Sequence, residues 1–354
     1  MKTTLKKLLM LAAVPIILYG CAAPPLPDLY WPSPPDAPRI KYVRDYRGSE
    51  NLDFKKSSMA AEILLGAEAS SALKKPNGIY TDDKGRVYVT DTAAADIFII
   101  DPAKKTATTL SEMGGSKSLY KPIGVTVDYQ GRIFVTDSQE DKVAMYEENG
   151  KFISNLTPDV PFKQPTGIIS DNINKKLYIT DTHTHDIRVF DLETLKPIRT
   201  IGKRGKEEGQ FNFPSNITVD PKGRVFVVDT MNGRVQIFDA EGKFIRAFGQ
   251  FGDAAGMFAR PKGIAVDSEG HIYVVDSAFN NVQIFDDEGQ ILLAFAGYGN
   301  DRGQLILPSG AAIDKDDFIY VVDSWNRRVE VFEFLGDKHK ARSAATAAPA
   351  PAKK

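Results

Sequence analysis

The sequence contains very little cysteine and has no excess of charge of either sign. Its 354 residues include one Cys, four His and two Trp, and 45 basic residues stand against 46 acidic ones. A single Cys cannot form an internal disulfide or a Cys-rich metal cluster. The charge balance argues against a protein that binds polyanions through bulk charge. With 42% hydrophobic residues the chain is too apolar for disorder, and its length fits two domains or one large all-β unit.

One apolar run, at the N-terminus, has the pattern of an export signal. Three lysines precede an apolar stretch over residues 8–18, which is too short to span a bilayer as a helix. The stretch ends in Leu-Tyr-Gly-Cys, which resembles the lipobox of bacterial lipoproteins. We therefore expect residues 1–20 to be a signal peptide and Cys21 to carry the lipid. An ordinary cleaved signal with an incidental Cys is the alternative.

The lipoprotein resemblance also implies a location. In that class, Ala22 after the Cys implies sorting to the outer membrane, on its periplasmic or cell-surface side. Several acyl chains on one residue would hold the protein firmly on the membrane, which is then one of its partners. Removal of residues 1–20 takes away three lysines and lowers the net charge from −1 to −4. The expected product is an exported, mildly acidic envelope lipoprotein.

Both flanks of the chain are expected to lie outside a folded core. Residues 21–38 are rich in proline, so they are expected to form an extended tether with a reach of up to ~50 Å. Tyr30 and Trp31 within it are either incidental or a docking strip, for a partner or for the protein's own surface. Residues 335–354 are rich in Ala, Pro and Lys and are expected to be disordered. A Ser cap and a Gly stop predict a short helix over residues 57–66.

The middle of the chain is a sixfold internal repeat. Each copy starts with a proline, continues through a short, mostly apolar segment to an Asp, and then has a turn, an apolar strand with an aromatic residue, and a final Asp followed by Ser or Thr. A glycine follows the proline by two residues in every copy but the fourth, where Asn216 replaces it. The copies start at prolines spaced 43–49 residues apart: Pro76, Pro122, Pro165, Pro214, Pro261 and Pro308. A feature present in every copy serves architecture. The repeated Asp is therefore expected to bond backbone N–H groups as an Asx turn.

Each copy divides into four short strands with no helical period, which predicts propeller blades. The last copy stops after its third strand, near residue 334. Residues 41–48 resemble the fourth strand of another copy, at 243–250, position by position. The predicted fold is therefore all-β: a six-bladed β-propeller of four-stranded antiparallel blades over residues 39–334. Its N-terminal strand closes the last blade and removes the exposed sheet edges.

The repeat resembles the NHL repeat. Copies four to six fit best through the strand residues and the Asn-x-Arg pairs Asn232/Arg234 and Asn326/Arg328, whereas copies one to three lack these pairs. The resemblance covers residues 39–334. It implies a propeller that serves for protein binding, RNA binding or, in some relatives, enzyme chemistry such as a zinc-dependent amidating lyase. The fold alone does not select among these functions.

One rim of the propeller carries the loops that differ between blades. It combines the loops after the repeated Asp with the loops that lead into each proline. An aromatic and Arg mixture there is typical of protein interfaces, with solvated or self-packed loops as the alternative. The candidate partner-binding residues are His183, His185, Met231, Arg234, Phe279, Asn280, Trp325, Asn326, Arg327 and Arg328.

Enzyme chemistry is the weaker hypothesis. His183 and His185 lie on the candidate rim and His271 on the opposite one, so three His ligands cannot meet at a zinc ion. No catalytic residue, metal ligand or cofactor is assigned, and a structural calcium ion on channel carboxylates or carbonyls stays open. The rim lacks the basic stripe of a nucleic-acid binder. The leading function is a membrane-anchored, non-catalytic scaffold for a protein, peptide or glycan partner. The alternative is a metal-dependent lyase or hydrolase with a site in the central channel.

Overall fold

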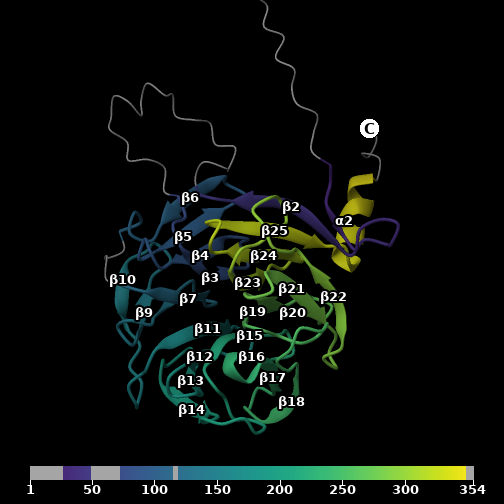
Figure 1. Ribbon diagram of the computed structural model, residues 1–354. Helices are drawn as coiled ribbons and strands as arrows, with labels where there is room; N and C mark the ends of the chain where they lie inside the picture. The colour runs from purple at the N-terminus through teal and green to yellow at the C-terminus, as the bar shows by residue number, and fades with distance from the viewer. Residues whose placement is uncertain (1–26, 49–71, 115–118, 348–354) are drawn as a thin grey trace, which may run out of the picture.

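Six antiparallel sheets surround one central axis in the computed structural model, which describes residues 27–48, 72–114 and 119–347 (Figure 1). Each repeat supplies one sheet, named blade one to blade six in the order of the prolines. The first strands contact one another in an unbroken ring, from β3 through β7, β11, β15 and β19 to β23 and back to β3. The predicted six-bladed propeller is thereby confirmed.

The strand bounds follow the repeat closely. Blade one contains β3 (Pro76–Thr81), β4 (Val87–Asp91), β5 (Asp96–Asp101) and β6 (Thr106–Thr109). Blade two contains β7 (Pro122–Val127), β8 (Ile133–Asp137), β9 (Lys142–Tyr146) and β10 (Phe152–Asn155). Blade three contains β11 (Pro165–Asp171), β12 (Lys176–Asp181), β13 (Asp186–Asp191) and β14 (Pro197–Ile201). Blade four contains β15 (Pro214–Val219), β16 (Val225–Asp229), β17 (Arg234–Phe238) and β18 (Phe244–Phe248), with the 3₁₀ turn η2 (Thr230–Asn232) between β16 and β17. Blade five contains β19 (Pro261–Val266), β20 (Ile272–Asp276), β21 (Asn281–Phe285) and β22 (Ile291–Phe295).

Blade six joins the two ends of the chain. It contains β23 (Pro308–Ile313), β24 (Phe318–Asp323) and β25 (Arg328–Phe334), and its fourth strand is β2 (Ile40–Tyr46). Strand β2 pairs with β25 from Ile40 opposite Phe334 to Tyr46 opposite Val329. The predicted closure by the N-terminal strand is confirmed. Because β2 supplies the fourth strand of blade six, the N-terminal and C-terminal parts of the ring are joined within one sheet.

The core lies between neighbouring blades. The second strand of each blade is buried on both faces, and the aromatic residue of each repeat fills the space against the next sheet. One cluster, for example, packs Val87 and Val89 of blade one against Tyr320 and Val322 of blade six. Burial of this kind explains why these strands read as continuous apolar runs. It also explains why the aromatic position recurs in all six copies.

The glycine two residues after the proline allows close approach of the first strands near the axis. A Cβ added at Gly124 would overlap the carbonyl oxygen of Thr166 in the next blade, and Gly78 stands in the same relation to Ile123. Only a residue without a side chain fits such a position. Blade four departs from the pattern, because Asn216 occupies this position.

The N-terminal segment packs on the propeller. Tyr30 and Trp31 form β1, which extends blade six by pairing with β2. The Trp31 ring lies 5.6 Å from Phe332 and 6.1 Å from Phe295, centroid to centroid. The prediction of a free tether over residues 21–38 is therefore wrong for residues 27–38, because apolar burial of Trp31 outweighs the extended preference of the prolines. The aromatics form a docking strip for the protein's own surface.

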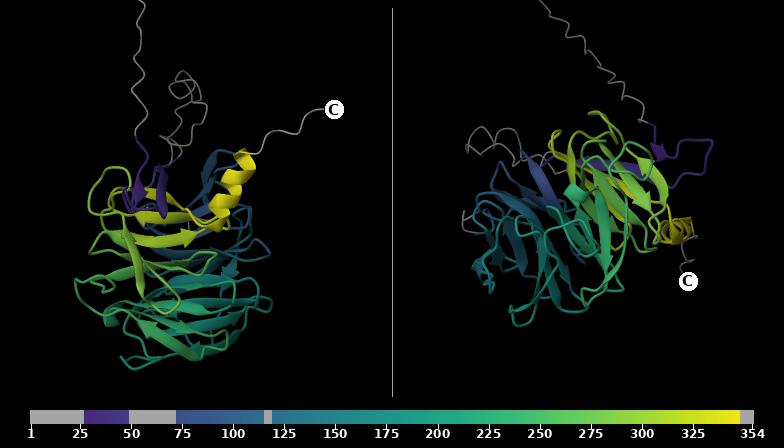
Figure 2. Two further views of the ribbon diagram at one scale, coloured as in Figure 1. Left: turned by 90° about the vertical axis from the view of Figure 1, so that its right-hand side faces the viewer. Right: turned by 60° about the horizontal axis from the view of Figure 1, so that its bottom comes forward.

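A second correction concerns the C-terminal tail, predicted to be disordered from residue 335 onward. Residues 337–347 form the helix α2 (Asp337–Ala347), at the edge of the molecule (Figure 2). Arg342 bonds Glu333 at 2.7 Å, and the backbone N–H of Asp337 donates to Glu269 at 2.7 Å. Composition missed this helix because polar contacts with blades five and six hold it.

Several predictions fall outside the described residues. These are the signal peptide 1–20, the lipidation of Cys21, the short helix over 57–66 and the end of the tail beyond 347. Within the described part of the chain, α2 included, no helix has the length and apolar character needed to cross a bilayer.

Candidate binding surface and central channel

The repeated Asp residues hold one rim of the propeller together. Asp91 accepts hydrogen bonds from Ala93 and Ala94 in the loop that follows it, as predicted for an Asx turn. It also accepts from Lys74 and Lys75 in the linker that leads into the proline. Equivalent bonds across the two loops recur in the other blades, at Asp137, Asp181, Asp229, Asp276 and Asp323.

These bonds place both loop types on the same rim, which we call the proline rim. It consists of the linkers between blades and the Asp loops, meaning the residues that join the second and third strands. The opposite, hairpin rim carries the turns within each blade. Burial raises the pKa of Asp181 to about 6, against the opposing effect of the Lys163 N–H bond. Since each of these Asp residues accepts hydrogen bonds from backbone or side-chain groups of the two loops that it joins, the carboxylates are architectural.

Two of the predicted partner-binding arginines are structural. Arg328 is only 1% exposed, and its guanidinium bonds Asp323 and the carbonyls of Asn300, Asp301 and Gln304. Arg234 repeats this pattern in blade four, with Asp229 and the carbonyls of Glu207 and Gln210. Both side chains tie a linker to an Asp loop. The Asn-x-Arg signature therefore stabilises the rim, and Arg328 is not available to a partner.

Three further candidates are also engaged within the protein. Asn326 donates to Asp323 and to the carbonyl of Gly299. Asn280 accepts from the backbone N–H of Leu307. His185 is buried, accepts from the N–H of Phe213 and packs edge-to-face against that ring, with the centroids 4.5 Å apart. Sequence reasoning could not separate these residues from surface ones, because polar loop residues look alike until their partners are placed.

The remaining candidates are accessible. Trp325 is 68% exposed and Met231 is 54% exposed, while Arg327 and His183 are exposed and Phe279 is half-buried. The structure adds large apolar side chains that the sequence analysis missed on the same rim. We define the apolar sector as the proline-rim residues of this type on blades four to six: Met231, Phe251, Phe279, Tyr298, Leu307 and Trp325.

The sequence contains a pattern that could have predicted the exposure of Phe251 and Tyr298. Phe251 and Tyr298 occupy the same position in two glycine-punctuated linkers, where blade three to four has Arg204. Gly297 and Gly299 flank Tyr298, and Gly252 follows Phe251, so few neighbouring side chains along the chain can cover these two rings. Tyr298 is accordingly 73% exposed. Chain neighbours of the members also lie close together: a Cβ at Gly233, two residues after Met231, would touch Phe251, and the N–H of Trp325 donates to the carbonyl of Ile306, the residue before Leu307.

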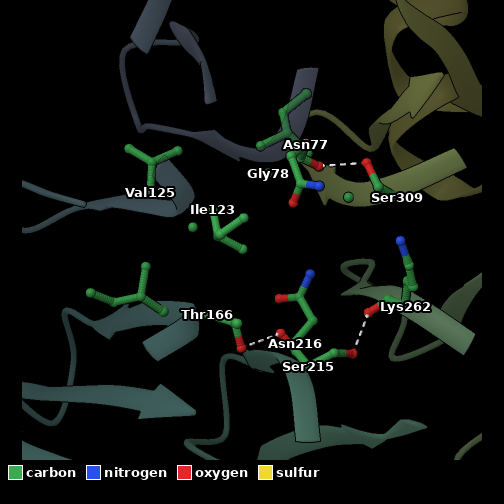
Figure 3. A pocket seen from close by; sticks show the side chains of 14 residues that line it. Asn77, Gly78, Ile123, Val125, Thr166, Ser215, Asn216, Lys262 and Ser309 are labelled. Carbon is green, nitrogen blue, oxygen red and sulfur yellow. Dashed lines mark hydrogen bonds between the residues drawn. The ribbon is translucent and has the colours of Figure 1, made fainter. Parts of the chain in front are cut away.

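The central channel opens on the proline rim through a cavity of about 200 Å³. The residues that follow the six prolines line it: Asn77, Ile123, Thr166, Ser215, Lys262 and Ser309. Lys262 is the one charged side chain among these lining residues, and it is partly buried. In Figure 3, Asn77, Asn216 and Lys262 project into the space that the lining residues enclose.

The other end of the channel, of about 400 Å³, is acidic. Its carboxylates belong mainly to the hairpin turns, and Asp82 is typical in accepting from the N–H groups of Lys84 and Arg86. His271 also lies on this rim. A hydrogen bond to Asp267 raises its pKa. Within the described ranges, no group of three or more His, Cys, Asp or Glu side chains is placed to hold a metal ion.

Comparison with known proteins agrees with this architecture. Residues 206–289 match a family described as a 6-bladed beta-propeller, and residues 305–332 match the NHL repeat. The chain contains an NHL repeat within a six-bladed β-propeller domain. NHL propellers commonly mediate protein interactions.

Similar sequences cover only short parts of larger proteins. Protein lin-41 from Caenorhabditis elegans is 53% identical over 49 residues, 14% of this chain and 4% of that protein. NHL repeat-containing protein 2 from Gallus gallus is 30% identical over 93 residues, 23% of this chain and 13% of that protein. The chain thus matches a small fraction of the length of these relatives, and their whole activities do not transfer to it.

Solved structures share the fold. A streptogramin B lyase gives a TM-score of 0.55 at 16% identity, over 74% of this chain and 94% of that chain. An auxiliary nutrient binding protein from Bacteroides thetaiotaomicron gives a TM-score of 0.59 at 16% identity, over 74% of this chain and 69% of that chain. At such identities the likeness concerns the fold alone, which hosts both an enzyme and a binding protein.

Proposed function

We propose that this protein is a membrane-anchored, non-catalytic scaffold of a bacterial envelope, and that its apolar sector binds a protein partner. The observation that carries the proposal is the gathering of exposed aromatic and aliphatic side chains on one rim of blades four to six. Aromatic residues and Met are enriched at the centre of protein interfaces, and exposed apolar patches mark interaction sites. The propeller would supply a rigid surface that changes little on binding.

The anchor is part of the proposal. Lipidation of Cys21 would leave residues 22–26 as the free link, because the chain packs on blade six from residue 27. Six peptide units reach ~20 Å when fully extended. The guanidinium of Arg302, in the linker between blades five and six, bonds the carbonyl of Pro27. The link therefore begins beside the proline rim, so the partner surface would lie close to the membrane.

Metal-dependent lyase chemistry finds less support in this chain. One similar structure is described as a catalytically inactive histidine-to-alanine variant of virginiamycin B lyase, with a TM-score of 0.52. The described residues that line the two ends of the channel here include no histidine. His185 is buried against Phe213, and His271 does not line the channel, although it pairs with Asp267, which does.

Site-specific photo-crosslinking tests the partner surface. A benzoylphenylalanine placed at Trp325 or Tyr298 in cells should give a discrete protein adduct. Ile245, exposed on the outer strand of blade four, is the control position and should give none. Equal adducts at Trp325 and Ile245, or adducts at neither rim position, would exclude the apolar sector as the docking surface. For the anchor, Cys21→Ser should move the protein from the membrane to the soluble fraction, and retention would exclude lipidation as the tether.

A further inference from the structure

The channel mouth on the proline rim breaks the sixfold symmetry of the propeller. At the position after the proline, three blades carry hydroxyls that donate to the main-chain carbonyl of the next blade. Thr166 donates to Ser215 at 3.0 Å, Ser215 to Lys262 at 3.4 Å, and Ser309 to Asn77 at 2.7 Å. These bonds join neighbouring blades. Lys262 and Asn77 occupy the same position without that role.

The Lys262 ammonium has no partner within the described ranges. No hydrogen bond or ion pair forms at its Nζ, although carboxylates neutralise most buried cations of this protein. Burial lowers the pKa of Lys262, and the positive charges of Arg260 and Lys75 lower it further. These two residues come from the linkers of blades five and one, so the mouth carries positive charge from more than one blade. A cation in this setting is stabilised by an anion that enters the channel.

Two side-chain amides stand with it. The Oδ1 atom of Asn216 accepts from the N–H of Ile217 at 2.8 Å, which directs its Nδ2 donor toward the cavity. Asn77 lies across the cavity from Asn216, and neither amide group has another side-chain partner in the described chain (Figure 3). Asn216 also replaces the glycine of the other five blades. Asn216, which departs from the repeated glycine, and Asn77 therefore line the same cavity as Lys262, the single charged side chain among its lining residues.

The donors fit a carboxylate. One ammonium and two amides match one negative charge spread over two oxygens, whereas a phosphate dianion is better served by Arg forks or a metal ion. A cavity of about 200 Å³ admits a carboxylate with a few attached atoms. The acidic far end of the channel repels an anion, so the ligand would enter from the proline rim.

We propose that the channel mouth binds the carboxylate of a small acid or of a peptide C-terminus, with Lys262 as counter-ion and Asn216 and Asn77 as hydrogen-bond donors. This site is separate from the apolar sector and does not depend on the proposed protein partner. It gives the channel a ligand class of its own.

The test follows the Lys262 amine by NMR in the full chain, with lysines labelled as ¹³C-dimethyl amines and Lys262→Met supplying the assignment. N-acetylglycine, its amide and a tripeptide with a free or an amidated C-terminus are the probes. We expect the free carboxylates to shift the Lys262 signal and raise its pKa, and the amides to leave both unchanged. Binding followed by calorimetry should weaken at least tenfold in Lys262→Met. The matched control Lys222→Met, exposed on the hairpin rim, should bind as the parent does.

Asn216→Gly restores the residue of the other blades, so it separates loss of binding from loss of folding. It should fold normally and bind carboxylates more weakly. If the tripeptide binds and N-acetylglycine does not, the ligand is a peptide terminus; if both bind, small acids suffice. The proposal is overturned if no carboxylate perturbs Lys262 at millimolar concentration. Equal effects of acid and amide, or of Lys262→Met and Lys222→Met, would overturn it as well.

Discussion

Replacing Glu330 by Gln should stabilise the protein, and increasingly so as the pH rises. Glu330 lies fully buried in β25, and neither carboxylate oxygen has a hydrogen bond among the described residues. Arg328 approaches Oε1 to 2.9 Å as an ion pair without hydrogen-bond geometry. Burial raises the pKa of Glu330 to about 8, and the Arg328 charge and the nearby Tyr42 hydroxyl oppose this only in part.

The same position in blades four and five shows what a glutamine would do. Gln236 accepts from the N–H of Gly209 at 2.9 Å and donates to the carbonyl of Gln210 at 2.7 Å. Gln283 makes the equivalent pair of bonds with the linker of blade five. In blade six the corresponding groups are the N–H of Gly303 and the carbonyl of Gln304. A neutral amide at position 330 would satisfy both and remove the buried charge.

The sign of the pH effect follows from linkage. The folded state binds a proton at Glu330 between the unfolded pKa of 4.5 and the folded value of about 8, so stability falls as the pH rises through this window. At ~1.4 kcal/mol per pH unit, the loss is roughly 3 kcal/mol at pH 7 and at most about 5 kcal/mol above pH 9. In a protein of this size, Tm shifts by ~2 °C for each kcal/mol of change in the free energy of unfolding. Glu330→Gln should therefore raise Tm by about 6 °C at pH 7.

Urea unfolding of parent and variant at pH 5, 7 and 9 measures this difference. Glu333→Gln is the control with the opposite sign. Burial raises the pKa of Glu333, but hydrogen bonds from His339 and Arg342 outweigh burial, and the pKa is lowered. Its charged form stabilises the fold above the unfolded pKa, so Glu333→Gln should destabilise at pH 7. A Glu330→Gln gain that is constant from pH 5 to pH 9 would refute the buried-charge reasoning.

Three further substitutions test the packing. Trp31→Ala should cost about 2 kcal/mol and expose residues 27–38 to proteolysis, because the ring holds that segment on blade six; resistance equal to the parent would contradict the docking. Gly124→Ala should lower the free energy of unfolding by ~2 kcal/mol or more, measured by thermal unfolding, because the added Cβ would overlap the next blade. Gly297 has open space around it, so the control Gly297→Ala should change this free energy by less than ~0.5 kcal/mol. Arg342→Ala should speed hydrogen exchange in α2 while leaving the propeller strands protected, and unchanged exchange would show that other contacts hold the helix.

The propeller could be predicted because each repeat carries its own local instructions. The proline and the terminal Asp mark the start of the first strand and the end of the second in every copy, and five of the six copies also have the glycine two residues after the proline. Closure was visible as well, since residues 41–48 repeat the pattern of 243–250. Six copies of one pattern allow each strand to be predicted from several examples. The predicted number of blades and of strands in each blade therefore agrees with the structure.

The rim residues were harder to assign, because polar side chains on loops serve structure and binding alike. Arg328 and Arg327 are neighbours in sequence, but one is buried in a network of carbonyls and the other is exposed. Only the placement of the linkers decides between them. Lys262 was missed for the opposite reason: it lies within a strand, where a single lysine looks unremarkable unless the six copies are compared position by position.

The pairing of β2 with β25 ties the completion of folding to the synthesis of almost the whole chain. Ile40 can pair with Phe334 only after the ribosome has made residue 334. A contact between residues so distant in sequence forms late and slowly. A protein exported with its N-terminus first would present β2 long before its partner strand arrives, with an unpaired edge that other chains can join. If the chain is exported as proposed, β2 would need protection from such pairing during transit, which a blade built from consecutive strands would not need.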